Sequence, residues 1–160
     1  MSALRLRDFA AGDDAALIGW VGSPEELERF AGPTLSWPLT MAQLDGLRAD
    51  PAVSAWSAYT DPLTRAAVGH VELVRVGPRA GRIVRVLLDP RRRGEGLARP
   101  LVAAAVSRAR ALGITDLGLK VFADNAPAIR AYRALGFEDV GEDPADPRVR
   151  VHALRTDVAS

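Results

Sequence analysis

The sequence contains no cysteine. A chain without cysteine has no disulfide framework, no thiolate zinc site and no cysteine nucleophile. If this chain catalyses acyl transfer, the acyl group therefore cannot pass through a cysteine thioester on the protein, and the attack on the acyl donor has to be direct.

The sequence also has little excess charge of either sign. Its 21 Lys and Arg residues oppose 20 Asp and Glu residues, which leaves a formal net charge of +1, and Lys120 is the only lysine. A chain so close to neutral has no field that would concentrate it on nucleic acid or on an anionic membrane. We therefore expect neither a nucleic-acid partner nor a membrane partner.

Long hydrophobic runs are missing as well. The longest uncharged apolar run, Pro100 to Val106, is far too short to cross a bilayer, and the first residues lack the apolar segment of a secretory signal. We therefore expect a soluble, cytoplasmic protein. With 160 residues, 48% of them hydrophobic, the chain has the size of one domain, which we expect to extend over residues 1–160.

Hydrophobic spacing predicts a chain of mixed helices and strands. In order, we expect a strand at about residues 3–9, helices to about 21, from 24 and over 40–48, strands at 55–59, 66–76 and 81–88, a helix ending before 113, a strand at 117–121, a helix from about 126, and strands at 137–141 and 148–155. This order predicts an α+β fold whose mixed sheet contains a crossover helix.

A glycine-rich turn, within the segment DPRRRGEGLARPL at residues 89–101, precedes one of these helices. Because Pro100 lacks an N–H group, it fits best in the first helical turn, so the helix should begin no earlier than residue 96. The main-chain N–H groups from Gly94 to Arg99 would then be free at the positive end of the helix, where a phosphate can bind. A plain turn with its arginines in solvent is the alternative.

The segment Arg93-Gly94-Glu95-Gly96-Leu97-Ala98 resembles the pyrophosphate loop of the GNAT superfamily of acyl-CoA-dependent N-acyltransferases. Residues 69–73 and 82–90 resemble the family's third and fourth strands, and residues 119–137 resemble its second motif. The resemblance extends from about Val68 to Phe137, whereas residues 1–66 agree only in the order of their elements. It implies a GNAT-like fold with a central mixed, mostly antiparallel twisted sheet of about 6–7 strands flanked by helices.

The resemblance further implies acetyl-CoA as cosubstrate, with no metal. Loop residues would bind the pyrophosphate, the backbone of the fourth strand would bond the pantetheine arm, and Asn125, also a good helix N-cap, would lie near that arm. The implied cofactor-binding residues are Val86, Leu87, Leu88, Arg93, Gly94, Glu95, Gly96, Leu97, Ala98, Arg99, Asn125 and Tyr132.

Two residues are candidates for catalysis. Tyr132 would protonate the departing CoA thiolate, although a tyrosine of the apolar core is the alternative interpretation. Glu72, on the same strand face as His70, is the candidate base that deprotonates the amine, and a solvent-facing strand position or an ordered water chain are its alternatives. Some relatives place a glutamate where this chain has Lys120, and others where it has arginine.

We therefore expect an N-acetyltransferase that joins acetyl-CoA and a primary amine in a ternary complex, with a main-chain N–H such as that of Leu88 binding the oxyanion. A non-catalytic acyl-CoA-binding sensor or interaction module is the alternative. A peptide N-terminus, a polyamine, an aminoglycoside or an amino acid all remain open as acceptor, as do acyl-chain preference and a homodimer. Aromatic residues that could line the acceptor pocket, or belong to the core, are Trp20, Phe30, Trp37 and Trp56.

Overall fold

The computed structural model describes residues 3–156, in which seven strands form one sheet. The strands are β1 (Arg5–Asp8), β2 (Val53–Tyr59), β3 (Gly69–Arg75), β4 (Ala80–Leu88), β5 (Asp116–Phe122), β6 (Glu138–Asp143) and β7 (Asp146–Arg155). They lie in the order β1-β2-β3-β4-β5-β7-β6, and every neighbouring pair is antiparallel except β4 and β5, which are parallel. The predicted α+β fold with a mixed, mostly antiparallel sheet is confirmed.

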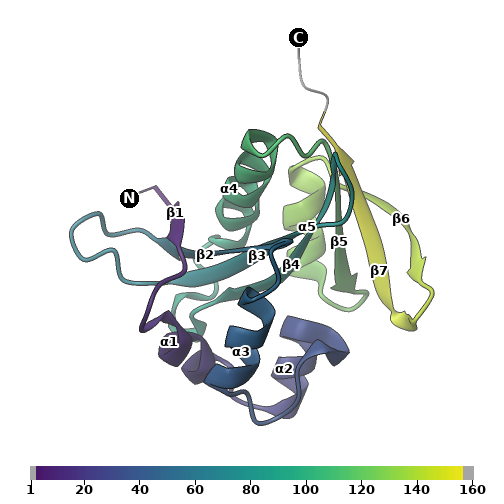
Figure 1. The fold of residues 1–160 in the computed structure, drawn as a ribbon. Helices are drawn as coiled ribbons and strands as arrows, with labels where there is room; N and C mark the ends of the chain where they lie inside the picture. The colour runs from purple at the N-terminus through teal and green to yellow at the C-terminus, as the bar shows by residue number, and fades with distance from the viewer. Residues whose placement is uncertain (1–2, 157–160) are drawn as a thin grey trace.

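The helices cover both faces of this sheet (Figure 1). They are α1 (Asp13–Trp20), α2 (Pro24–Ala31), α3 (Met41–Arg48), α4 (Ala98–Ala111) and α5 (Ala126–Ala134), with short 3-10 turns at Gly32–Thr34 and Pro90–Arg92. Helices α4 and α5 lie on one face, and α1, α2 and α3 lie on the other. Within the described part of the chain, no helix is long and apolar enough to cross a membrane.

Two separate hydrophobic clusters fill the interior. The larger one joins the sheet to α4 and α5, and its fully buried residues include Leu73, Ile83 and Leu101. The smaller one is formed mainly by α1, α2 and α3, around Leu17 and Leu27. The sheet therefore carries a different apolar layer on each face.

Helix starts follow the expected local chemistry. The Ser23 hydroxyl accepts a hydrogen bond from the N–H of Glu26 at 3.1 Å, and Asn125 Oδ1 accepts one from Ala128 at 3.4 Å. The Glu26 carboxylate in turn accepts a hydrogen bond at 2.7 Å from the N–H of Gly22, the residue before the Ser23 cap. Helix α4 begins at residue 98, which places its proline in the first turn as predicted.

The parallel pair β4–β5 is short. Its register contains only Ala80–Asp116, Gly81–Leu117 and Arg82–Gly118, so within residues 3–156 the two strands do not pair beyond those positions. The register between β3 and β4 shifts beyond the Glu72–Val84 pair, where the bulge residue Arg85 has a φ of +49°. Because a bulge bends its strand, β4 and β5 diverge toward their C-terminal ends. We call this opening the β4–β5 wedge.

Candidate functional site

The loop between β4 and α4 is held open by two glycines. Gly94 and Gly96 have φ values of +81° and +73°, in the left-handed region that favours glycine. Among the described residues, no protein acceptor receives a hydrogen bond from the N–H groups of residues 94–99. The N-cap residue Leu97 has no side-chain capping bond. These free N–H groups lie at the helix N-terminus, which is the geometry expected of a phosphate site.

The arginines around this loop differ in their contacts. Arg91 Nη2 lies 2.8 Å from the buried Asp89 carboxylate, whose pKa this hydrogen bond lowers, and Arg92 Nε lies 2.9 Å from Glu95. The Arg93 guanidinium is exposed, with its Nη1 4.0 Å from the carboxylate of Glu26. Arg91 and Arg92 therefore stabilise the turn itself, while Arg93 is more available to a ligand.

The end of β4 has main-chain groups directed into the β4–β5 wedge. The N–H of Asp89 donates to the carbonyl of Val68 at 2.9 Å, and Leu88 is opposite Gly69 in the register. Because bonding directions alternate along an antiparallel strand, the N–H and C=O of Leu88 face away from β3. They face the side from which β5 has separated, where a ligand can bond to them like an added strand.

Helix α5 carries Tyr132 into the larger apolar cluster. The side chain is buried, and its ring lies edge-on to Phe137 with 6.2 Å between centroids. Burial raises the pKa of Tyr132 to about 12. The phenol therefore keeps its proton at every ordinary pH, as a proton donor requires. Asn125 caps the same helix seven residues earlier.

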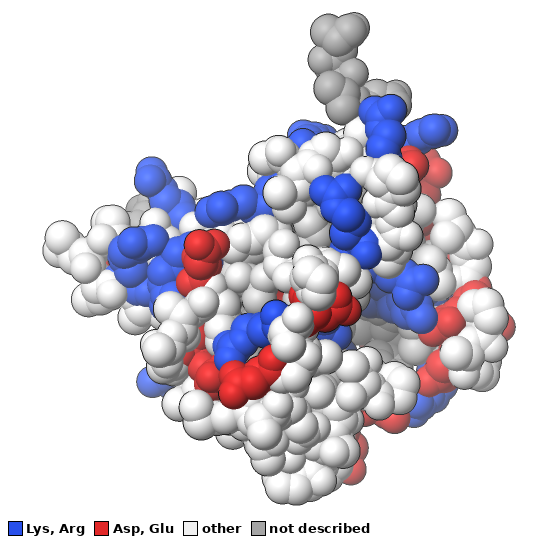
Figure 2. Space-filling view, viewed as in Figure 1, with Lys and Arg blue, Asp and Glu red and all other residues white. Residues whose placement is uncertain are grey.

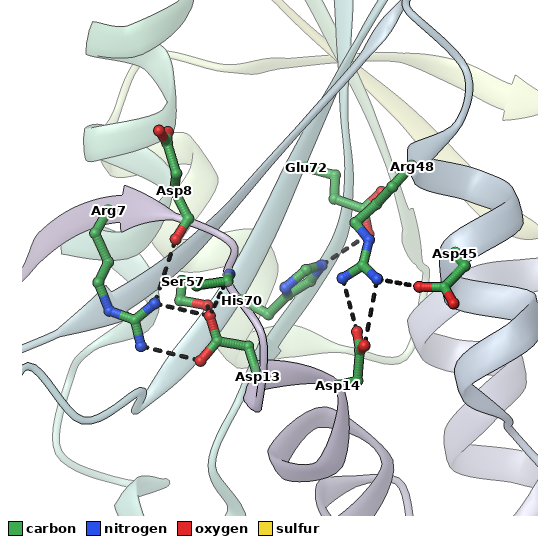
Figure 3. Close-up of polar contacts among 10 residues, drawn as sticks. Arg7, Asp8, Asp13, Asp14, Asp45, Arg48, Ser57, His70 and Glu72 are labelled. Carbon is green, nitrogen blue, oxygen red and sulfur yellow. Dashed lines mark hydrogen bonds and ion pairs between the residues drawn. The ribbon is translucent and has the colours of Figure 1, made fainter.

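Glu72 lies in a buried cluster with His70 and Arg85. Its Oε1 accepts from Arg85 Nε at 2.9 Å, and its Oε2 lies 2.7 Å from His70 Nε2. Figure 3 shows the imidazole pointing toward this carboxylate. Burial by itself would raise the pKa of Glu72, but the hydrogen bonds and the charges of His70 and Arg85 outweigh it, and the pKa is lowered.

The alternative of a solvent-facing position for Glu72 and His70 is therefore wrong, because both side chains are almost fully buried. The physical reason is that Phe9 and Phe30 cover this part of the sheet. Their ring centroids lie 5.2 and 6.0 Å from that of His70. Sequence reasoning gave Arg85 no binding role, although a charged residue within the apolar run of residues 83–88 was a signal.

A second polar network joins α1 to the first two strands. The Asp13 carboxylate accepts from Arg7 at 2.7 Å and from the Ser57 hydroxyl at 2.8 Å, as Figure 3 shows. Arg48 makes a similar bond to Asp14 at 2.7 Å. These contacts fix α1 against β1 and β2, and α3 against α1, and they were not expected from the sequence.

Three of the four aromatic candidates for the acceptor pocket belong to the interior. Trp20, Phe30 and Trp56 are buried, whereas Trp37 is 45% exposed. No group of three His, Asp or Glu side chains in the described residues is arranged to hold a metal ion. On the face seen in Figure 2, Lys and Arg side chains are interspersed with Asp and Glu side chains.

The order of the strands, the β4–β5 wedge and the loop of free N–H groups define the chain's class. The model of the acetyltransferase (GNAT) family matches residues 22–137, and the chain belongs to this family. The resemblance inferred from the sequence is confirmed.

Individual relatives agree with this assignment. A mycothiol acetyltransferase from Brachybacterium faecium is 33% identical over 147 residues, which are 89% of this chain and 43% of that protein. The chain thus spans less than half the length of this relative.

Two solved structures show the same fold at lower identity. Spermidine N-acetyltransferase from Vibrio cholerae, in complex with CoA and spermine, is 19% identical with a TM-score of 0.77, and the match covers 94% of this chain and 93% of that one. An aminoglycoside acetyltransferase in complex with ribostamycin and coenzyme A is 22% identical with a TM-score of 0.77, covering 97% and 94%.

Proposed function

We propose that this chain is an N-acetyltransferase that transfers an acetyl group from acetyl-CoA to a primary amine by direct attack in a ternary complex. The observation that carries the proposal is the relation of the loop and α5 to the β4–β5 wedge. The loop follows the C-terminal end of β4, and the helix with Tyr132 follows that of β5. The loop with the free N–H groups and the helix with the buried phenol therefore both begin at the open end of the β4–β5 wedge.

In this proposal, acetyl-CoA lies along the β4–β5 wedge. The free N–H groups of residues 94–99 bind its pyrophosphate, with charge added by Arg93 and Arg99. The pantetheine arm bonds to the backbone of residues 86–88, and Asn125 lies near it. All cofactor-binding residues expected from the sequence are retained: Val86, Leu87, Leu88, Arg93, Gly94, Glu95, Gly96, Leu97, Ala98, Arg99, Asn125 and Tyr132.

The reaction needs one new bond and one broken bond. The amine nitrogen attacks the thioester carbonyl, and the N–H of Leu88 stabilises the oxyanion. When the C–S bond breaks, the electron pair goes to sulfur and Tyr132 donates its proton to the thiolate. Burial widens the gap between phenol and thiol pKa, but the same apolar surroundings also disfavour the thiolate, which keeps the transfer feasible.

Glu72 is retained as the candidate proton acceptor for the amine. Its lowered pKa means that it is a carboxylate at neutral pH, and its contacts with His70 and Arg85 leave one lone pair on each oxygen unused. Because the side chain is almost fully buried, the proton reaches it through water rather than by direct contact with the amine.

The acceptor is proposed to be a small amine or a peptide N-terminus. A single domain over residues 1–160 and a cytoplasmic location stay predictions. The non-catalytic acyl-CoA-binding module is the less favoured alternative, because α5 retains both Tyr132 and, at its N-cap, Asn125, the two residues to which the resemblance assigns contacts with the cosubstrate.

Titration calorimetry with acetyl-CoA and a free-thiol assay with a panel of amines test the proposal together. We expect saturable acetyl-CoA binding, amine-dependent thiol release, and a Tyr132→Phe variant with nearly unchanged acetyl-CoA affinity but lower kcat. Binding without thiol release from any amine would support the non-catalytic module. Absence of acetyl-CoA binding would refute both.

A further inference from the structure

Arg85 is a buried arginine whose guanidinium is only partly used. Its side chain is 8% exposed, and its Nε donates to Glu72 at 2.9 Å. In the part of the chain that the structure describes, its two terminal nitrogens form no hydrogen bond. Both nitrogens are nevertheless in contact with solvent, because neither is among the fully buried polar atoms that lack a hydrogen-bond partner.

The backbone of Arg85 has an unfavourable conformation. Its φ of +49° lies in the left-handed region, which is unfavourable for a residue with a Cβ, and the residue forms the bulge of β4. Strain of this kind persists where the surrounding structure holds it, and it is concentrated at functional sites. The ion pair with Glu72 compensates the buried charge and orients the guanidinium at the same time.

Two more cations lie beside the β4–β5 wedge. Arg82 is exposed, and it forms no ion pair with any residue between 3 and 156. Gly118 is its register partner, and Lys120, two residues further along β5, lies on the same face by strand alternation. Lys120 Nζ is 3.0 Å from Asp143, so this carboxylate is already matched by a cation, as Glu72 is by Arg85. Of these charges, the one that no ion pair within residues 3–156 matches is that of Arg82, and it is positive.

We propose that Arg85 binds a carboxylate of the acceptor, so that the acceptor is an α-amino acid or a similar small amine that bears a carboxylate. This inference rests on the proposed acetyl transfer and specifies its substrate class. The terminal guanidinium nitrogens bind a carboxylate through charge-assisted, bidentate hydrogen bonds, and Arg82 adds long-range attraction. The unpaired charge of Arg82 also disfavours a polyamine or a polycationic aminoglycoside, because like charges near a low-dielectric site are unfavourable.

The test compares each of the common α-amino acids with its own amide, and with spermidine, in the free-thiol assay. Saturable binding of the same compounds to the protein in the presence of CoA gives a second measurement that does not need turnover. We expect at least one acid to exceed its amide by roughly 10- to 100-fold in kcat/KM, the range for a lost hydrogen bond to a charged group. The binding constants should show the same preference.

Two variants assign the preference to its residue. Arg85→Gln should abolish the ratio of acid to amide in kcat/KM, mainly through KM for the acid, even though loss of the Glu72 ion pair lowers kcat for both compounds. Because this change leaves Glu72 without its arginine, Arg82→Gln, on an exposed side chain, serves as a second variant and should reduce the preference partially. Arg110→Gln, an exposed arginine of α4 on the opposite face, is the matched control and should retain the full preference.

The possible failures are distinguishable. Amides or spermidine used as well as acids would overturn the carboxylate site and leave acetyl transfer intact. If acetyl-CoA binds but no amine is acetylated, the binding measurements test the carboxylate site instead. Equal affinity for acids and amides would then overturn that site. Loss of acid and amide turnover in equal proportion in Arg85→Gln would assign Arg85 a structural role only.

Discussion

Arg82 of β4 and Gly118 of β5 are the last residues at which these two parallel strands pair in the described structure. Beyond them, β4 still pairs with β3 and β5 still pairs with β7. The wedge is therefore bordered on both sides by hydrogen-bonded strands rather than by loops. A wedge bordered in this way is already ordered in the free protein, so ligand binding costs little conformational entropy.

Gly96→Ala should weaken acetyl-CoA binding. Its φ of +73° costs an L-residue about 1–2 kcal/mol, so the loop of the variant relaxes in the free protein and has to be strained again on binding. We expect a Kd for acetyl-CoA raised by about tenfold, as that energy implies, measured by calorimetry.

Gly113→Ala is the matched control for the loop variant. Gly113 has a φ of +79°, and like Gly96 it has open space where a Cβ would lie, but it ends α4 instead of starting it. This variant should lose stability and keep its acetyl-CoA affinity. Equal effects of the two substitutions on Kd would contradict a role of the loop in binding.

Tyr132→Phe should change how stability depends on alkaline pH. The pKa of Tyr132 is raised to about 12 in the folded protein, above the ordinary value near 10, so its contribution to stability is complete below pH 10. That contribution falls as the pH rises toward 12, because the unfolded phenol ionises first. We expect the variant to gain about 1 kcal/mol relative to the wild type between pH 8 and pH 11.

Urea unfolding at the two pH values measures this difference. Tyr59 is present in both proteins, so its effect cancels in the comparison. An unchanged difference between variant and wild type would show that the phenol is not desolvated in the folded chain.

The pH profile of kcat/KM should not report Glu72. Because the pKa of this carboxyl is lowered, it is ionised throughout the working range, and the rise of kcat/KM with pH should follow deprotonation of the acceptor amine. We expect Glu72→Gln to lower the rate while the position of this rise is unchanged. A rise that disappears in the variant would instead assign the limiting ionisation to Glu72.

Asp13→Asn should destabilise the fold at neutral pH. Burial alone would raise the pKa of Asp13, but bonds from Arg7, from the N–H of Ala10 and from Ser57 outweigh it and lower the pKa. The stability that this gives is present above the ordinary pKa of about 4 and is lost as the pH falls through the lower value of the folded state. We expect a loss of about 2 kcal/mol at pH 7 that becomes smaller at pH 3.

Asp8→Asn is the control for this change, measured in the same unfolding experiments. Asp8 is exposed, and its carboxylate forms no hydrogen bond with the residues that the structure describes. It should therefore leave stability nearly unchanged at both pH values. A similar loss in both variants would show that general charge, not the Asp13 network, is responsible.

Local signals predicted most of the fold. Ser23 and Asn125 mark helix starts, Pro100 limits the start of α4, and alternation predicts the strands. The last strand, β7, begins at Asp146, two residues before the expected start at residue 148. These features depend on neighbours in sequence, which is why they can be predicted. The motif at residues 93–98 likewise placed the loop correctly.

The buried polar cluster could not be predicted in the same way. Alternation tells which residues share a strand face, but the aromatic cover over His70 comes from α2 and from the segment after β1. The left-handed backbone of Arg85 depends on the bulge between β3 and β4, which no local pattern indicates. Long-range packing decides both features.

The two apolar clusters allow one layer of the chain to vary independently of the other. Side chains of α1, α2 and α3 pack mainly with one another, whereas α4, α5 and the sheet share the other cluster. Substitutions in the first three helices can therefore change the smaller cluster without disturbing the larger one, which contains Tyr132. Under the proposed function, the acceptor side can therefore change by substitution while the groups proposed to hold acetyl-CoA are kept.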